Sequence, residues 1–337
     1  MLVSALALTG CASQPVDPSP ADSGAPGASA DDATTLVDCG VDVTPMTHPA
    51  ERIVAVKSTA AELVVALGLG DALVSTAFLD GPLVGADGSP IDAPTIEGMP
   101  SREAVLGLEP DAVVAGWESA FAPEAVGDRA ALHELGVTTW VSPAACWSTD
   151  VPALTWDALL DEFADAGAAL GVPEAGAALA DEQRAVLEAI EPVGGAAGES
   201  NDSGDSAGDA DTGGLQALWY SSGEDAPYVG AGSGAPQLVL ETAGLTNVAA
   251  DIDETWTTVS WEALAASEPD VIVLVDAPWH TAQSKIDRLQ ANPATAELQA
   301  VRDERYVVIP FPQAEAGVGS VAAAQAVADA VRAMGLG

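Results

Sequence analysis

The sequence predicts an α/β protein with two similar lobes, each built on a mostly parallel sheet that carries helices on its faces. Its 337 residues are enough for two lobes that each bury a core. Runs of β-branched residues alternate with helix-forming segments, which is typical of parallel sheets. One segment also occurs twice, at a separation too long for a solenoid. Together these observations favour two lobes of one architecture.

The repeated segment occupies residues 101–114 and 260–273. Both copies carry Ser, Glu, Ala, Glu, Pro and Asp at identical spacing, followed by a β-branched run. The pattern predicts a short helix with Ser at its N-cap and an acid in its first turn. Pro then ends the helix, and a buried strand follows. The two copies therefore predict one such unit in each lobe.

The remaining segments agree with this division. In the first lobe, residues 36–150, we expect strands at 52–57, 73–78 and 138–141, and helices ending at Gly68 and Gly136. In the second lobe, residues 215–337, we expect strands at 215–220, 271–275 and 306–309, and helices at 236–243 and 320–334. Residues 152–192 predict one long connecting helix, with Gly171-Val172-Pro173 as the one place for a break. Residues 193–214 predict a flexible insertion rich in Gly, Ser and Asp.

The first residues of the sequence suggest a signal for export from the cytoplasm. Residues 1–11 end in Leu8-Thr9-Gly10-Cys11, which resembles the bacterial lipobox whose cysteine is acylated. No basic residue precedes the apolar stretch, so either the start lies further upstream or the match is accidental. Residues 12–35 favour the lipobox because their Ser, Pro, Gly and Ala content is that of a disordered tether. We expect Cys11 to be a lipid site that anchors the chain to the outer face of the cytoplasmic membrane.

Composition excludes some partners. The formal net charge is −41, from 51 acidic residues against 10 Lys and Arg, and this repels phosphate backbones. We therefore expect no nucleic-acid partner. No apolar run approaches the roughly 20 residues that cross a bilayer. The two other cysteines, Cys39 and Cys146, fit either a disulfide or two buried free thiols, and both interpretations stand.

The ligand is expected beyond the carboxyl ends of the strands. At the first of these, Lys57 precedes Ser58 and Thr59, and a cation at a helix N-terminus is an anion site. The alternative is that Thr59 and Glu62 only cap the helix while Lys57 extends to solvent.

Several other strand ends are aromatic, which suits a large planar organic ligand. For each aromatic residue the alternative is packing within the protein, which we expect to hold for about half of them. The candidate ligand-binding residues are Lys57, Ser58, Thr59, Phe78, Asp80, Trp117, Trp147, Tyr220, Ser221, Tyr228, Trp256 and Trp279.

Neither a metal receptor nor an enzyme finds support. His48, His133 and His280 are scattered, so we expect no metal site and no cofactor. The Gly230 loop lacks the spacing of a nucleophile elbow or a dinucleotide fingerprint, so we expect no catalytic residue. A surface hydrolase and a purely structural lipoprotein are the alternatives.

Three features together carry a family resemblance: the segment 49–54, the helix end Leu67-Gly68-Leu69-Gly70-Asp71, and the two Ser-x-Glu…Pro-Asp copies. Over residues 49–334 the chain resembles the class III periplasmic binding proteins of cobalamin, haem and iron-siderophore importers. The resemblance implies two Rossmann-like lobes joined by a single long helix, a small organic ligand, and no covalent chemistry. It also implies a monomer whose partners are an ABC permease and its ATPase subunits.

In that family, one Glu on each lobe docks into Arg pockets on the permease. By position these are Glu103 and Glu262, and a carboxylate can accept paired bonds from Arg. The alternative is that both are only first-turn helix acids.

Within the family, three segments resemble actinobacterial lipoproteins proposed to bind a precursor of the deazaflavin coenzyme F-420: residues 57–59, residues 219–223, and Phe311-Pro312. We expect an anionic, ring-containing ligand of this kind, with a ferric siderophore, haem or cobalamin as the alternative.

Overall fold

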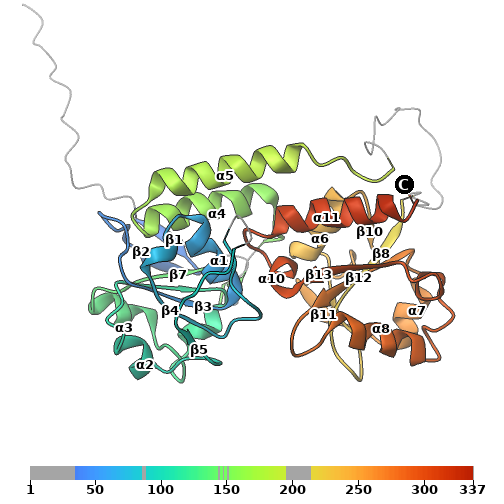
Figure 1. Cartoon of the computed structure of the whole chain (residues 1–337), viewed down its shortest axis with the longest axis horizontal. Coiled ribbons are helices and arrows are strands. Elements are labelled where there is room, and N and C mark those ends of the chain that lie inside the picture. The colour runs from blue at the N-terminus through green and yellow to red at the C-terminus, as the bar shows by residue number, and fades with distance from the viewer. Residues whose placement is uncertain are drawn as a thin grey trace, which may run out of the picture. The chain divides into compact units, whose positions relative to one another are not determined.

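The computed structural model describes residues 35–85, 89–142, 145–146, 148–149, 152–194 and 214–336, which form two lobes (Figure 1). The first lobe holds a parallel five-stranded sheet of order β5-β4-β3-β6-β7. Its strands are β3 (Ile53–Val56), β4 (Leu73–Ala77), β5 (Thr95–Ile96), β6 (Ala112–Ala115) and β7 (Thr138–Val141). Its helices are α1 (Ser58–Ala66), α2 (Arg102–Leu106) and α3 (Arg129–Glu134), with 3₁₀ turns η1 (Gly70–Ala72) and η2 (Glu118–Phe121).

The second lobe is built on a sheet of order β11-β9-β8-β12-β13, with β10 beside β8. Only the pairings of β9 with β8 and of β11 with β9 are antiparallel. The strands are β8 (Gln216–Ser222), β9 (Tyr228–Gly230), β10 (Thr246–Asn247), β11 (Trp256–Thr258), β12 (Val271–Asp276) and β13 (Tyr306–Pro310). The helices are α6 (Ala235–Thr242), α7 (Trp261–Ala266), α8 (Ala282–Ala291), α9 (Gln299–Arg302), α10 (Phe311–Ala314) and α11 (Ser320–Ala333).

The repeated segment has the same structure in both lobes. Ser101 caps α2 and Ser260 caps α7, each accepting a bond from the backbone N–H three residues on, at 3.3 and 3.1 Å. After the proline, Asp111 accepts the backbone N–H of Arg52, just before β3, at 2.9 Å. In the second copy, Asp270 accepts the backbone N–H of Gln216, the first residue of β8, at 2.9 Å. The repeated Asp therefore ties β6 to β3 in one lobe and β12 to β8 in the other.

A disulfide closes one corner of the first lobe. The short ribbon of β1 (Leu36–Asp38) and β2 (Val41–Val43) turns at Cys39, which is bonded to Cys146. Beside it, the buried Asp38 carboxylate pairs with Arg129 at 2.6 Å. Desolvation raises the pKa of Asp38 to about 6, and the Arg129 charge opposes that rise. The ribbon is thus fixed to β7 and α3 by a covalent bond and an ion pair.

The connection between the lobes is interrupted at Gly171-Val172-Pro173, where the sequence allowed a break. In place of one long helix there are two, α4 (Trp156–Ala169) and α5 (Pro173–Glu188), which lie side by side in Figure 1. Gly171 has a φ of 77°, where glycine carries no steric cost, and Pro173 begins α5 because it lacks an N–H to continue α4.

Two glycines let the helices approach closely. A Cβ on Gly176 would lie 2.6 Å from the Phe163 carbonyl oxygen and 3.0 Å from the Cα of Gly167. The close contact stabilises the hairpin in place of a continuous rod.

The hairpin packs against both lobes. Leu159, Leu160 and Phe163 of α4 enter the core of the first lobe. Trp156 packs against both cores and donates to Thr242 Oγ1 of α6 at 2.8 Å.

Some expectations fall on residues outside the described ranges. The signal at 1–11 with Cys11, most of the tether and most of the insertion at 193–214 are among them. No described helix is long and apolar enough to cross a bilayer.

We predict that Gly176→Leu lowers the free energy of unfolding by about 1–3 kcal/mol, because the new side chain must separate α4 from α5. The control is Ala177→Leu, at an exposed position of the same helix, which should change stability by no more than about 0.5 kcal/mol. Urea unfolding followed by far-UV circular dichroism measures both. Equal effects would contradict the close helix contact.

Candidate functional site

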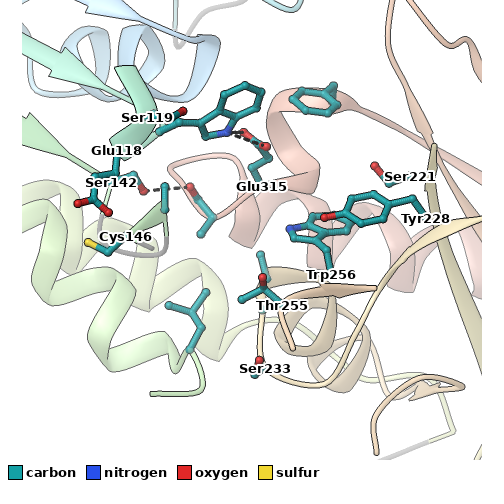
Figure 2. Close-up of a pocket in the computed structure, with 18 of the residues that line it drawn as sticks. Glu118, Ser119, Ser142, Cys146, Ser221, Tyr228, Ser233, Thr255, Trp256 and Glu315 are labelled. Carbon is teal, nitrogen blue, oxygen red and sulfur yellow. Dashed lines mark hydrogen bonds between the residues drawn. The ribbon is translucent and has the colours of Figure 1, made fainter. Parts of the chain in front are cut away.

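A cavity of about 680 Å³ lies between the lobes. The first lobe contributes residues 116–119, Ser142, Ala145 and Cys146, and the start of the connecting segment contributes Pro152 and Leu154. The second lobe contributes Ser221, Ser222, Tyr228, residues 233–235, Thr255, Trp256, Trp279, Phe311, Glu315 and Ala316. Figure 2 shows side chains of both groups pointing into the same space. The size is in the range of sites for organic small molecules.

Most of the lining follows the carboxyl ends of strands. Gly116 and Trp117 follow β6, Ser142 follows β7, and Phe311 follows β13. The order in which strands are added to the first sheet reverses at β3, because β4 lies on one side of β3 and the later strand β6 lies on the other. Ligands in open α/β sheets bind at such a switch point, so the topology itself places the cavity here.

Aromatic rings form the walls. Tyr228 stacks on Trp256 with ring centroids 5.8 Å apart and planes 18° apart, as Figure 2 shows. Trp279 meets Phe311 edge to face at 5.5 Å, and its side chain is 58% exposed. Exposed tryptophan in a cavity wall offers a large flat surface to a ligand.

One hydrogen bond crosses the cavity wall between lobes. The Trp117 indole Nε1 donates to both carboxylate oxygens of Glu315, at 3.1 and 3.2 Å, and Figure 2 draws this bond to Glu315. Desolvation raises the pKa of Glu315 to about 7, against the lowering effects of the Lys57 charge and the indole bond. A second contact between the lobes joins Ser142 Oγ to the carbonyl of Ala316 at 3.4 Å.

Lys57 lies behind this wall and not in the cavity. It is 1% exposed and forms an ion pair with Asp80. Its ammonium stands over the rings of Trp117, Phe78 and Phe311, at 4.0, 4.5 and 5.1 Å from their centroids. Its backbone φ of 81° is left-handed, which is rare for a residue with a side chain and fits a position fixed by its surroundings.

The helix that begins beside Lys57 has no side-chain cap. Ser58 Oγ accepts the backbone N–H of Asp80 at 2.8 Å, and the expected box of Thr59 and Glu62 does not form. Glu62 is partly buried near Asp80, and desolvation followed by the Asp80 charge raises its pKa to about 7. Lys57 is paired with Asp80 behind aromatic rings and is not among the described lining residues, so ligand contact by Lys57 stays a prediction that this geometry does not support.

The structure brings part of the predicted set together. Trp117, Ser221, Tyr228, Trp256 and Trp279 line the cavity. Lys57, Ser58, Thr59, Phe78 and Asp80 lie behind the wall. Tyr220 is buried among Trp261 and His280, and its hydroxyl donates to the carbonyl of Gly223 at 2.8 Å. Trp147 lies outside the described residues.

Sequence reasoning missed Glu315 of the lining. Glu118 directly follows Trp117 at a strand end that the sequence indicated, but the candidate set did not include it. Its carboxylate accepts the backbone N–H of Ser148 at 2.9 Å and bonds the Ser148 hydroxyl as well. Glu315 lies five residues beyond β13 and reaches the cavity only because the short helix α10 turns the chain back. The lining serines carry no sequence signal.

Within the described ranges, one group of three potential metal ligands is present: Asp38, Cys39 and Cys146. Both sulfurs are joined in the disulfide, so neither is a thiolate that could hold an ion.

The comparisons agree with this geometry. The family model described as "Periplasmic binding protein" matches residues 53–312, which is most of the chain. The chain belongs to the periplasmic binding protein family. A search of curated proteins with this sequence found no match.

Solved structures resemble this periplasmic binding protein throughout both lobes. A periplasmic binding protein from Veillonella parvula has a TM-score of 0.69 at 20% identity, with 89% of this chain and 97% of that chain covered. A protein of an ABC-type Fe³⁺-hydroxamate transport system from Saccharomonospora viridis has a TM-score of 0.66 at 22% identity, with 88% and 98% covered. A periplasmic haem-binding protein from Roseiflexus has a TM-score of 0.60 at 24% identity, with 83% and 99% covered. At these identities the likeness shows the fold.

This fold is that of a class III periplasmic binding protein, with two α/β lobes joined through helices. Membership implies an extracytoplasmic location and delivery of a small ligand to an ABC permease.

We predict that Glu62→Gln makes stability less dependent on pH. A pKa raised from 4.5 to about 7 means that the native state keeps a proton which the unfolded chain releases, so this contribution is full below pH 4.5 and lost as pH rises through 7. The free energy of unfolding of the variant minus that of the wild type should therefore be about 1–3 kcal/mol larger at pH 8 than at pH 5. Urea unfolding at both pH values measures it, with exposed Glu182→Gln as the control. The same difference at both pH values would contradict the burial of this carboxyl.

Proposed function

We propose that this protein is the substrate-binding subunit of an ABC importer and that it captures a ring-containing organic ligand in the cavity between its lobes. The observation that carries the proposal is the joint lining of one cavity by both lobes, with Trp117 of one and Trp256 of the other on its walls. A ligand held there contacts both lobes at once, and its release requires them to separate.

Closure of the lobes on the ligand is proposed to be modest. The α4/α5 hairpin packs against both lobes, and the Trp117–Glu315 bond already spans them. Small rotations would then be enough to admit and release a ligand, and the permease would supply the force for release.

The deazaflavin precursor is the specific candidate that the sequence resemblance offers. The stacked and edge-to-face rings of the walls support a flat ring system. A ferric siderophore or haem is the second candidate, because the structural neighbours include a protein of a hydroxamate system and haem-binding proteins. Lys57 no longer supports an anionic ligand, since Asp80 neutralises it behind the wall.

A binding role fits the lining better than hydrolysis does. Six serine and threonine hydroxyls reach the cavity, namely Ser119, Ser142, Ser221, Ser222, Ser233 and Thr255, yet no histidine is among the described lining residues. A serine nucleophile needs a base within hydrogen-bond reach.

Docking on the permease is proposed to use Glu103 and Glu262. Both are exposed, and both lie in the first turn of a helix capped by serine in the same way. Each helix leads directly into a central strand, β6 or β12, so its first turn lies toward the carboxyl edge of the sheet, where the cavity is. This gives each lobe one carboxylate for an arginine on the partner.

We predict that the double variant Glu103→Gln/Glu262→Gln stimulates ATP hydrolysis by the permease–ATPase complex in liposomes at least about tenfold less than the wild type does. The reason is that two charge-assisted contacts with the permease are removed. Stability and ligand binding should be unchanged. The matched control is Glu109→Gln/Glu268→Gln, which alters the exposed second acids of the same repeat. Normal stimulation by the first pair would contradict the docking role.

The proposed membrane attachment rests on Cys11. Its lipobox-like context and the tether that follows it support acylation, with two or more chains giving stable anchoring. Cys11→Ser should move the protein from the membrane fraction to the soluble fraction of cells of its own source. Unchanged membrane association, with no acyl mass on the wild-type protein, would contradict it.

A further inference from the structure

The positively charged residues of the chain are all accounted for in the described ranges. The ten Lys and Arg and the three His lie within residues 48–332, and the undescribed segments contain none of them. None of these thirteen residues lines the cavity. An anionic ligand would therefore find no counter-charge there.

The three buried Lys and Arg side chains of the described ranges are already engaged. Lys57 is paired with Asp80 behind the aromatic wall. Arg129 is paired with Asp38. Lys285 is buried, and its ammonium donates to the backbone carbonyls of Val275 and His280 at 2.6 and 2.5 Å. Turning any of these side chains into the cavity would leave a buried carboxylate or carbonyl unpaired, at a substantial cost.

The charges that do line the cavity are acidic. Glu118 comes from the first lobe and Glu315 from the second, and they are the only charged residues among the described lining. The chain around them carries a net charge of −41, which makes the potential in a cleft more negative still. A group entering the cavity thus meets a field that favours positive charge.

The walls favour the same sign of charge. The faces of Trp and Tyr attract cations through the ring quadrupole, and Tyr228, Trp256 and Trp279 all line the cavity. The protein itself uses this attraction behind the wall, where the Lys57 ammonium stands 4.0 Å from the Trp117 ring centroid. The opposite face of that wall is open to a ligand.

From these observations we infer that the ligand is an organic cation, a flat or alkylated molecule whose positive charge lies between Glu315, Glu118 and the aromatic walls. This inference rests on the proposed binding function, and it replaces the ligand candidates named there with a cationic class. An anionic molecule of the same shape would lose its hydration without gaining a counter-ion, so the cavity selects against it.

Three planar tricyclic probes test the charge class: proflavine, which is cationic at pH 7, riboflavin, which is neutral, and flavin mononucleotide, which is riboflavin with an added phosphate. Isothermal titration at 0.15 M salt should give a one-to-one complex with proflavine that is at least about tenfold tighter than that with riboflavin. Flavin mononucleotide should bind more weakly than riboflavin. Binding of riboflavin or flavin mononucleotide as tight as that of proflavine would overturn the inference.

Variants separate the cavity from the acidic surface. At pH 8, above the pKa of about 7 of Glu315, Glu315→Gln should weaken proflavine binding by about tenfold more than it weakens riboflavin binding, with Glu118→Gln as a second variant should the first not fold. Exposed Glu188→Gln is the charge-matched control and should change neither. Trp256→Ala should remove the one-to-one site for both probes. Equal effects of Glu188→Gln and Glu315→Gln on proflavine would assign the binding to the surface and overturn the inference.

A metabolite extract separates failure of this inference from failure of the proposed function. The extract is divided on ion exchangers into cation-retained, anion-retained and unretained fractions, and each is offered to the protein before native mass spectrometry. Capture from the cation-retained fraction supports the inference. Capture only from another fraction overturns the charge class and leaves the binding function standing, whereas capture from none, with no probe bound, contradicts the binding function itself.

Discussion

One buried ammonium group organises the wall between the two lobes. Lys57 stands over Trp117 and Phe78 of the first lobe and over Phe311 of the second, while Asp80 neutralises it. Breaking such a buried pair by removing one partner typically costs about 3–5 kcal/mol, so the arrangement is strongly specified. Two of these rings, Trp117 and Phe311, line the cavity, whereas Phe78 lies behind its wall. The shape of the binding surface therefore depends on a residue that the ligand does not touch.

The same wall explains why the lobes are expected to move little. Trp117 donates across to Glu315, and the α4/α5 hairpin packs against both cores. Opening the cavity widely would expose Lys57 and break these contacts together. On the proposed binding function, capture would resemble the filling of a preformed space more than the closing of a hinge.

Repetition and strand ends were the most informative parts of the sequence. The Ser-x-Glu…Pro-Asp copies predict two capped helices leading into buried strands, and the structure has both. The rule that ligands lie beyond the carboxyl ends of strands indicated Trp117 and Trp279, and both line the cavity. Two features could not be derived from the sequence because they depend on contacts between distant segments. The long connector folds back where Gly167 meets Gly176, and Lys57 is neutralised by Asp80, which the sheet register brings to the same edge.

The central claim is that both lobes hold one ligand in the cavity between them. A crystal structure of the protein with its captured ligand tests this most directly. The account predicts ligand density between the Trp117 wall and the Tyr228–Trp256 stack, in contact with both lobes. Density confined to the surface of a single lobe, with the cavity filled only by water, would contradict it.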